Sequence, residues 1–120
     1  MRRFVWFMMA CLIGAFALSS LSAREAQRGI GTISAADLPK EAQQTIVLIK
    51  KGGPYPYKRD GVVFGNFEKR LPPHPRGYYH EFTVPTPGSR DRGARRIISG
   101  KTGELYYTDD HYETFRRVTE

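Results

Sequence analysis

The stretch Gly77-Tyr78-Tyr79-His80-Glu81-Phe82-Thr83-Val84 alternates its side chains between two faces and predicts a β-strand. Phe82 lies on one face of this strand, and Glu81 lies on the other, more polar face. The prolines and glycine within residues 85–89 break the strand, and residues 92–99 resume extended chain. Two neighbouring antiparallel strands are therefore expected in this part of the chain.

Residues on both sides of this strand pair complete an α+β pattern. A helix over residues 39–50 is predicted because apolar side chains recur at helical spacing, with Asp37 placed to cap its start. Further strands are expected at residues 105–108 and 114–118. The predicted architecture is one main N-terminal helix packed on a twisted antiparallel β-sheet.

The N-terminal residues have the pattern of a secretory leader. Arg2 and Arg3 precede an unbroken apolar run over residues 4–18, and small and polar residues follow up to Ala23. The run is shorter than the roughly 20 residues that a membrane-spanning helix needs. We therefore expect a cleaved signal peptide over residues 1–23, secretion to the medium or the periplasm, and no stable membrane association afterwards.

The sequence after the leader predicts one domain. Residues 24–37 are expected to form a flexible lead-in, with one short strand near residues 32–34, before a domain over residues 38–120. The single Cys11 lies in the leader, so the mature protein has no disulfide and no cysteine nucleophile. Loss of the leader leaves 17 basic and 12 acidic residues, a net charge of +5 that attracts nucleic acid, heparin-like sugars and anionic lipid alike.

A carboxylate, two arginines and an imidazole together suit the cleavage of an RNA phosphodiester. That reaction needs a base for the 2'-hydroxyl, fixed positive charge for the phosphoryl oxygens and an acid for the departing 5'-oxygen. Glu81 is the candidate base and His111 the candidate acid, with Arg92 and Arg96 as a clamp for the phosphate. Each has a plainer interpretation, because strand carboxylates, arginine runs and loop histidines are usually solvated surface residues.

Metal-dependent chemistry at Asp109-Asp110-His111 is a competing account of the same region. Adjacent acids rarely converge on one ion without further ligands at suitable spacing, and no second carboxylate cluster accompanies them. We therefore expect neither a metal nor any other cofactor.

Several motifs, in the same order along the chain, resemble those of the secreted microbial guanyl-specific ribonucleases. They extend from about Leu38 to Phe115 and include Gly53-Pro54-Tyr55-Pro56-Tyr57, Asp60-Gly61-Val62-Val63-Phe64, Gly77 to Val84, Thr86-Pro87-Gly88, Arg95-Arg96-Ile97-Ile98 and Asp110-His111-Tyr112. The resemblance implies a helix packed on a twisted antiparallel sheet. It also implies an enzyme that cuts single-stranded RNA after guanosine through a 2',3'-cyclic phosphate, with Glu81 as base, His111 as acid, and Arg92 and Arg96 as phosphate-binding arginines.

The resemblance further implies a guanine site. Glu68 matches the carboxylate that accepts the N1–H and N2–H donors of guanine. Phe64 and Tyr112 match aromatic residues that contact the base, although core packing is the preferred interpretation of Phe64 without the resemblance. The backbone amides available to the O6 and N7 atoms belong to Gly65, Asn66 and Phe67.

Two features depart from the family pattern. That pattern includes a disulfide joining the chain ends, which this mature chain cannot form, and Gly65 and Phe67 replace longer polar residues in the guanine loop. By analogy we expect a monomer and a small acidic intracellular inhibitor of the barstar type. The rival hypothesis is a non-catalytic cationic protein that binds RNA or an anionic surface through its arginines.

Overall fold

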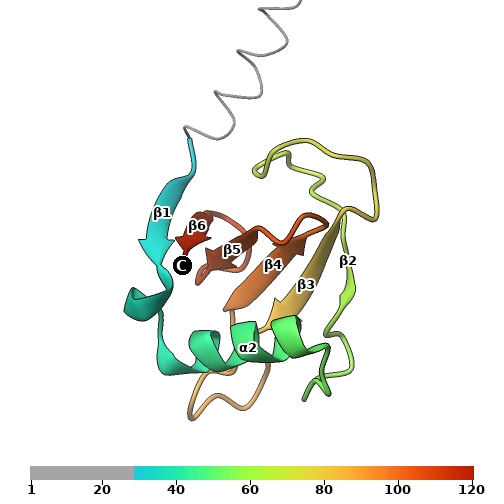
Figure 1. The fold of residues 1–120 in the computed structure, drawn as a ribbon. Helices are drawn as coiled ribbons and strands as arrows, with labels where there is room; N and C mark the ends of the chain where they lie inside the picture. Colours follow the sequence, from blue (N-terminus) through green and yellow to red (C-terminus); the bar gives the residue numbers. More distant parts are fainter. Residues whose placement is uncertain (1–28) are drawn as a thin grey trace, which may run out of the picture.

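The computed structural model describes residues 29–120 and shows one helix lying against a six-stranded sheet (Figure 1). The predicted signal peptide, residues 1–23, lies outside the described residues. The elements in chain order are β1 (Gly31–Ser34), a 3-10 turn (Ala35–Asp37), α2 (Lys40–Lys51), β2 (Val62–Phe64), β3 (Tyr79–Thr83), β4 (Arg96–Gly100), β5 (Leu105–Thr108) and β6 (Arg116–Thr119). The predicted α+β class, with one main helix on a mostly antiparallel sheet, is confirmed.

The helix α2 forms one residue from where its apolar spacing predicts it. The residue at its N-cap is Pro39, so the prediction that Asp37 caps the helix is wrong. Asp37 instead belongs to the 3-10 turn, which closes when the Leu38 amide donates to the Ala35 carbonyl. At the other end Gly52 adopts φ 83, a left-handed conformation that suits glycine and ends the helix. Among residues 29–120, no helix combines the length and apolar character needed to cross a membrane.

The strands lie in the order β1-β6-β5-β4-β3-β2, and every neighbouring pair except one is antiparallel. The exception is β1, which pairs parallel with β6 in the register Gly31 to Arg116. The short strand expected near residues 32–34 is therefore present. It lies within the segment predicted as a flexible lead-in, so ordered structure begins before Leu38, because the backbone of β1 is hydrogen-bonded to β6.

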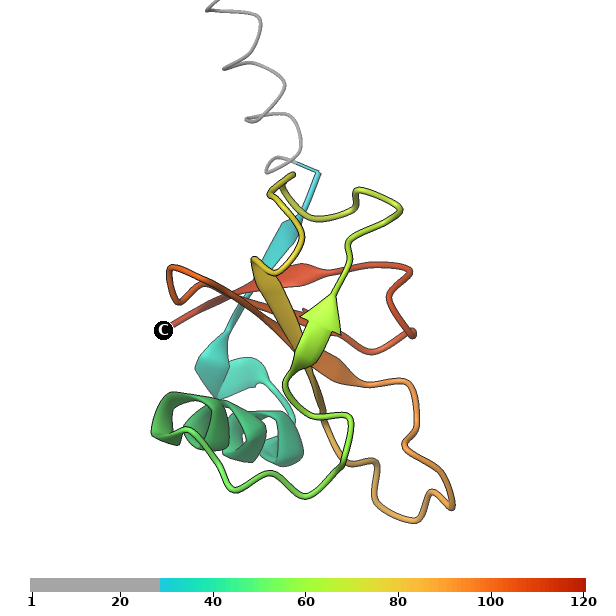
Figure 2. The same ribbon diagram turned by 90° about the vertical axis from the view of Figure 1, so that its right-hand side faces the viewer.

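Both faces of the sheet are buried. The helix α2 covers one face, as the turned view in Figure 2 shows, with a core of Leu38, Ala42, Ile46, Val84, Ile97, Leu105, Tyr107 and Val118. The other face carries a second core of Leu71, Tyr79, Ile98, Tyr106 and Phe115. Glu81 lies on this second face and is only 8 % exposed. The expectation of a polar face was therefore wrong, because residues distant in sequence, such as Leu71, cover it.

Candidate active site

The carboxylate of Glu81 lies on β3, the strand next to the edge strand β2, at one end of a pocket. β3 positions it between two strands, opposite Val62 of β2 and Ile98 of β4. Its Oε1 atom accepts a hydrogen bond of 3.0 Å from the Tyr112 hydroxyl and lies 3.7 Å from Nη2 of Arg92. A buried carboxylate is stable only when such donors and positive charges replace water.

Arg92 approaches Glu81 from the loop before β4. Its Nε donates to the Thr83 hydroxyl at 3.1 Å, which fixes the guanidinium against β3. Its Nη2 is buried and has no hydrogen-bond partner within the described residues. An unpaired buried donor costs roughly 1 to 3 kcal/mol. Nη2 of Arg92 is therefore a hydrogen-bond donor without an acceptor, close to the Glu81 carboxylate.

Arg96 is more deeply placed than its predicted role suggests. It is 3 % exposed, and its Nε donates to the Tyr112 hydroxyl at 3.1 Å. Its Nη1 donates to the backbone carbonyls of Gly93 and Arg95 at 3.0 and 2.7 Å. Arg92 and Arg96 thus do not form two open forks. Arg96 donates a hydrogen bond to the Tyr112 hydroxyl, and this hydroxyl in turn donates one to the Glu81 carboxylate.

Tyr112 is the link between these groups, and its backbone conformation is unusual. His111 and Tyr112 both have positive φ, 56 and 73, which is uncommon for residues other than glycine. The His111 amide donates to the Ala94 carbonyl at 3.0 Å, and the Tyr112 amide donates to the Thr108 hydroxyl at 3.2 Å. Burial, and then the negative charge of Glu81, raise the pKa of Tyr112. Its hydroxyl therefore stays protonated and able to donate at neutral pH.

The loop that carries His111 is fixed by its neighbour Asp110. The Asp110 carboxylate accepts hydrogen bonds from the Thr108 hydroxyl at 2.8 Å and the Thr114 amide at 2.9 Å. Partial burial favours a higher pKa, but the hydrogen bonds from Thr114 and Thr108 outweigh it and lower the pKa of Asp110 to about 2. The Asp110 carboxylate is thus ionised at neutral pH and accepts hydrogen bonds from Thr108 and Thr114.

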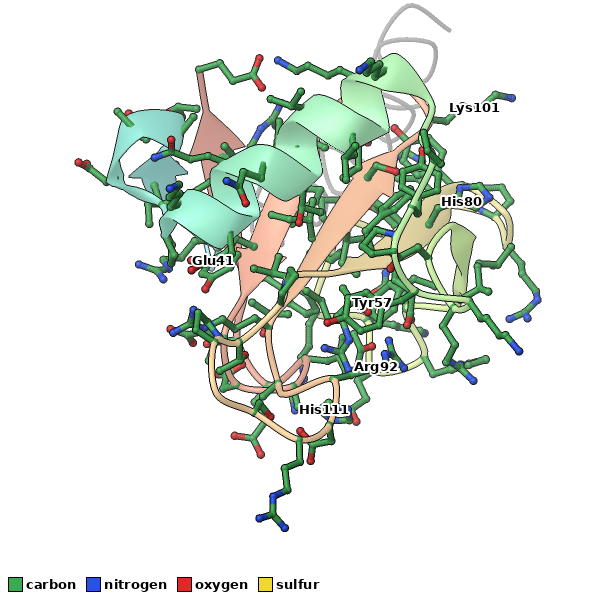
Figure 3. All side chains as sticks on the ribbon, turned by 90° about the horizontal axis from the view of Figure 1, so that it is seen from below. Glu41, Tyr57, His80, Arg92, Lys101 and His111 are labelled. Carbon is green, nitrogen blue, oxygen red and sulfur yellow. The ribbon has the colours of Figure 1, made fainter. Side chains whose placement is uncertain are left out.

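His111 itself is exposed, and its ring contacts the Tyr112 ring edge-on at 4.7 Å between centroids. Tyr112 therefore brings His111 to the same part of the molecule as Glu81. Figure 3 shows the labelled side chains of Arg92 and His111 at one end of the molecule, away from His80 and Lys101. His80 precedes Glu81 directly in the sequence, so it faces the opposite side of β3, because successive side chains of a strand alternate between its two faces.

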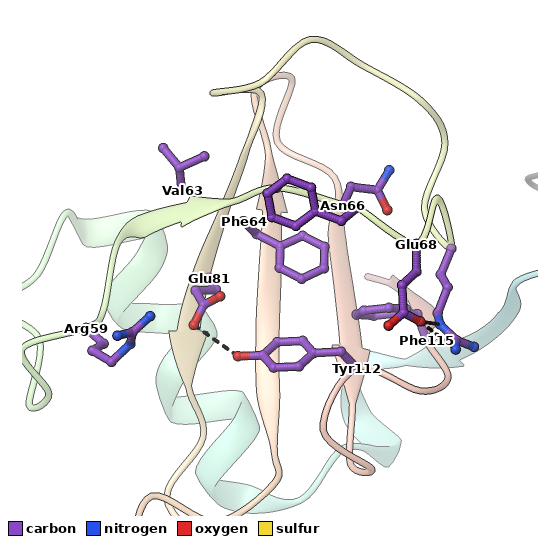
Figure 4. Close-up of a pocket in the computed structure, with 11 residues that line it drawn as sticks. Arg59, Val63, Phe64, Asn66, Glu68, Glu81, Tyr112 and Phe115 are labelled. Carbon is purple, nitrogen blue, oxygen red and sulfur yellow. Dashed lines mark hydrogen bonds and ion pairs between the residues drawn. The ribbon is translucent and has the colours of Figure 1, made fainter.

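A cavity of about 320 Å³ begins at Glu81 and is walled by aromatic rings. Phe64 and Tyr112 stack with ring centroids 5.4 Å apart and an angle of 24° between their planes. Phe115 meets Phe64 edge-on at 5.9 Å. Figure 4 shows Glu81 at one end of this cavity and Glu68 at the other, with the Phe64 and Tyr112 rings between them. A flat apolar group with polar edges suits such a space.

The far end of the cavity is formed by the loop over residues 65–70. The side chain of Asn66 fastens this loop, because it accepts from the Leu71 amide at 3.1 Å and donates to the Leu71 carbonyl at 2.9 Å. Glu68 is exposed and forms an ion pair with Arg70 at 2.6 Å. Arg70 also donates to the Glu113 carbonyl at 2.6 Å, which ties the loop to the segment after Tyr112.

The cavity brings together most of the residues that the sequence predicts for the site. Those that line it are Phe64, Gly65, Asn66, Phe67, Glu68, Glu81 and Tyr112, whereas Arg92, Arg96 and His111 lie behind or beside Tyr112. Sequence reasoning missed Arg59, Val63, Arg70 and Phe115. No local signal marks Arg59, because the contact that places its turn beside β3, the hydrogen bond of 2.8 Å from the Gly61 amide to the Glu81 backbone carbonyl, joins residues far apart in the sequence.

Acidic residues near His111 have other partners. Asp109 lies 3.7 Å from Arg116, and Asp110 is engaged by threonines. In residues 29–120 there is no group of three or more His, Cys, Asp or Glu side chains that could hold a metal ion.

A family model described as ribonuclease matches residues 22–119. The chain belongs to the ribonuclease family, which is the class of protein that its fold and site define. Within that family, the expected resemblance to the microbial guanyl-specific enzymes is confirmed. The chain is 58 % identical over 88 residues to guanyl-specific ribonuclease St of Saccharopolyspora erythraea, which covers 73 % of this chain and 87 % of that protein.

A second relative and two solved structures agree with this assignment. Guanyl-specific ribonuclease Sa of Kitasatospora aureofaciens is 55 % identical over 91 residues, or 75 % of this chain and 95 % of that protein. A structure of ribonuclease Sa2 from a study of complexes with mononucleotides superposes with a TM-score of 0.75 at 55 % identity, covering 76 % of this chain and 95 % of that chain. Ribonuclease Sa2 with guanosine-2'-cyclophosphate gives a TM-score of 0.72 at 54 % identity, covering 75 % and 96 %.

Proposed function

We propose that this protein is a secreted, guanyl-preferring endoribonuclease that cleaves single-stranded RNA through a 2',3'-cyclic phosphate, with Glu81 as general base and His111 as general acid. One observation carries the proposal. The buried carboxylate of Glu81 is held by Tyr112 and faces Arg92 at one end of an aromatic cavity, and a second carboxylate, Glu68, lies at the other end. A base-recognition site and a proton acceptor then lie at the two ends of one cavity.

In the first step, Glu81 accepts the proton of the ribose 2'-hydroxyl, and the 2'-oxygen attacks the phosphorus. His111 gives a proton to the 5'-oxygen as the P–O5' bond breaks, and the product keeps a 2',3'-cyclic phosphate. Arg92, which lies beside Glu81, supplies fixed positive charge for the phosphoryl oxygens, where negative charge increases in the transition state. Arg96 acts from behind by fixing the Tyr112 hydroxyl.

In the second step, the two groups exchange roles. His111, having lost its proton, accepts one from water, and the resulting nucleophile opens the cyclic phosphate. Glu81, now protonated, returns its proton to the 2'-oxygen, so that the enzyme regains its starting state and a 3'-phosphate is released. Ribonuclease Sa2 has been solved with guanosine-2'-cyclophosphate and with an exo-2',3'-cyclophosphorothioate, which supports a cyclic intermediate in this chain too.

Guanine preference follows from the far end of the cavity. Only guanine among the four bases presents two adjacent donors, N1–H and N2–H, and a carboxylate can accept both. Glu68 supplies that carboxylate, and both of its contacts with Arg70 use the same oxygen, Oε2. Amides of Gly65, Asn66 and Phe67 face O6 and N7, while the Phe64 and Tyr112 rings contact the base. Curated relatives of this chain carry the name guanyl-specific ribonuclease, which supports this choice of base.

The test is a cleavage assay on four dinucleotides, each with adenosine as the leaving nucleoside and a different base upstream, in the presence of a chelator. Guanylyl-adenosine should give guanosine 2',3'-cyclic phosphate at a higher rate than the other three. Glu81→Ala and His111→Ala should each lose orders of magnitude of turnover while still binding RNA, and an all-DNA substrate should survive because it lacks the attacking hydroxyl. Unchanged guanylyl-adenosine together with tight RNA binding would instead support the rival cationic binding protein.

Secretion, a monomeric state and a barstar-type inhibitor belong to the same proposal. Secretion requires the leader over residues 1–23 to be removed, so N-terminal sequencing of the exported protein should find a start close to Arg24. Gel filtration with light scattering tests the monomer. The inhibitor is expected because an active ribonuclease threatens the RNA of the cell that makes it before export.

A further inference from the structure

Besides the cavity at Glu81, the structure has a groove of about 250 Å³ where the connector before β3 meets β5 and β6. His74 and Tyr78 line it from the connector, and Glu104, Tyr106 and Arg117 line it from the side of β5 and β6. A smaller hollow of about 180 Å³ beside β1 shares Tyr106 and Arg117 with this groove, so the two adjoin. The proposed reaction uses none of these residues.

Strand pairing places the groove on the same face of the sheet as Glu81. Glu81 pairs with Ile98, Ile98 pairs with Tyr106, and Tyr106 pairs with Arg117. Residues that pair directly point to the same face of a sheet. Three strand spacings of about 4.8 Å separate the backbone of Glu81 from that of Arg117, which is about 14 Å in all. A single strand of RNA that is bound at Glu81 can therefore reach Arg117 along one face of the sheet.

The connector covers the middle of this row of residues. Leu71 packs against Ile98 and Tyr106, which are both buried. The Tyr79 hydroxyl donates a hydrogen bond of 2.6 Å to the Pro72 carbonyl, and this bond fixes the connector to β3. A strand of RNA that follows this face must therefore cross the outer surface of the connector.

His74 lies on that outer surface as part of an aromatic stack. Its ring lies parallel to the Tyr78 ring, with 3.7 Å between the centroids and 12° between the planes. The Tyr78 hydroxyl forms a hydrogen bond of 3.1 Å with the Thr102 hydroxyl, which holds the lower ring of the stack. Tyr78 covers one face of the exposed His74 ring and leaves the other face to solvent. Histidine is one of the side chains on which unpaired bases stack.

Arg117 supplies the positive charge of the groove. It is exposed, and ion pairs within residues 29–120 are formed by Lys50, Arg70, Arg92 and Arg116 but not by Arg117. The carboxylate of the groove, Glu104, accepts a hydrogen bond from the Thr102 hydroxyl. The Arg117 guanidinium is thus available to an external acceptor, and its planar fork matches two oxygens of a phosphate.

We propose that the groove is a second contact site for single-stranded RNA, in which a base of the substrate strand stacks on His74 and a phosphate binds Arg117. The inference rests on the proposed function, which makes RNA the substrate, and it adds a site outside the cavity that receives guanine. Affinity should therefore increase with the length of the strand. The choice of guanine should not depend on this site, because every base presents a π-face to His74.

The first experiment measures the binding of a labelled 2'-O-methyl oligonucleotide by fluorescence anisotropy. The oligonucleotide has eleven residues and one central guanosine, and it stays intact because it lacks the attacking hydroxyl. His74→Ala should raise its Kd by about fivefold or more, and His74→Phe should restore it, because phenylalanine keeps a ring for stacking. Turnover of guanylyl-adenosine, and the Kd of 2'-GMP by titration calorimetry, should not change, because these small ligands occupy only the cavity.

The second experiment measures how the Kd of the same oligonucleotide depends on salt. Each phosphate contact of a single strand contributes about 0.7 to the slope of log Kd against log salt concentration, so Arg117→Ala should lower that slope by about 0.7. Lys51→Ala is the matched control. It also removes one exposed positive charge, but from α2, which covers the other face of the sheet, so the slope should stay at the wild-type value.

Three results would overturn the inference. They are an unchanged Kd of the oligonucleotide for His74→Ala, a loss of equal size with an abasic strand of the same length, and a loss of equal size with guanylyl-adenosine. The abasic strand has no base to stack, and guanylyl-adenosine does not extend to the groove. If the wild-type protein cleaved no RNA, the proposed function would fail, whereas the anisotropy measurements would still show whether the groove binds RNA.

Discussion

The two carboxylates of the cavity are held in opposite ways. Glu81 is 8 % exposed, lies on β3 between the strands β2 and β4, and is fixed by the Tyr112 hydroxyl and by Arg92, which are themselves hydrogen-bonded to neighbouring residues. The side chain of Glu68 is 71 % exposed, sits on a loop, and has only a surface ion pair with Arg70. Surface ion pairs contribute about 0 to 1 kcal/mol, whereas a buried pair costs several times more to break. The site thus combines a fixed proton acceptor with a base-recognition group that can exchange partners.

The largest expected effect is that of Glu81→Gln. Glutamine keeps the size of the side chain and an oxygen for the Tyr112 hydroxyl, but it cannot accept a proton. We expect kcat for guanylyl-adenosine to fall by roughly 10²- to 10⁴-fold, with little change in the Kd of 2'-GMP. Initial-rate assays of product formation measure kcat, and titration calorimetry measures the Kd of 2'-GMP. If Glu81→Gln turned over at the wild-type rate, Glu81 would not be the general base, and the two carboxylates would not differ in the way proposed.

Glu68→Gln tests the other side of the comparison. An amide can accept from only one of the two guanine donors, and an unpaired donor in the complex costs roughly 1 to 3 kcal/mol. The ratio of kcat/KM for guanylyl-adenosine over adenylyl-adenosine should therefore fall by about tenfold or more. Cleavage of adenylyl-adenosine itself should stay within a few-fold of wild type. A variant that keeps its full preference for guanine would mean that backbone amides alone choose the base.

The same contrast explains what the sequence could and could not predict. The alternation around Glu81 and the helical spacing around Ile46 are local signals, so β3 and α2 were found. The burial of Glu81 was not predicted, because Leu71 covers its face from a connector whose path no local signal reveals. β1 was expected only as a short strand, since its parallel partner β6 lies at the other end of the chain.

Within the site, residue types were easier to predict than their roles. Arg96 was expected to offer an open fork, but Tyr112 and two backbone carbonyls engage it. This arrangement depends on a loop 16 residues further along the chain, which brings the Tyr112 hydroxyl between Arg96 and Glu81. Arg59 was missed because its relevance comes from strand pairing, which sets the turn before β2 beside Glu81. Long-range contacts of this kind leave no periodic signal in the sequence.

Tyr112→Phe is expected to have an intermediate effect, because it removes one atom from the fixed end of the cavity. Without the hydroxyl, Nε of Arg96 loses its acceptor in a buried place, which costs roughly 1 to 3 kcal/mol of unfolding free energy. Urea unfolding at pH 7 measures that loss. The loss of the hydrogen bond to Glu81 should also lower kcat more than it raises the Kd of 2'-GMP, since the ring remains against Phe64. Unchanged stability would show that Arg96 finds another acceptor.

The smallest expected effect concerns Asp110, which fixes the loop of His111. The pKa of this carboxyl is lowered from 3.8 to about 2, so its ionised form is favoured by folding. For a lowered pKa, the stabilisation is fully present above the unfolded pKa and disappears as the pH falls through the folded value. Because solvent screens this partly exposed group, we expect Asp110→Asn to cost about 1 kcal/mol at pH 6.

Most of that cost should disappear as the pH is lowered to 2, because the carboxyl is then protonated in the unfolded chain and about half protonated in the folded one. Urea unfolding of both proteins at pH 6, 4 and 2 measures the difference. Asp109→Asn is the matched control, since Asp109 has only a surface contact of 3.7 Å with Arg116 and should contribute little at any pH. A cost for Asp110→Asn that did not vary between pH 6 and pH 2 would mean that the geometry of the threonine hydrogen bonds, rather than the charge, holds the loop of His111 in place.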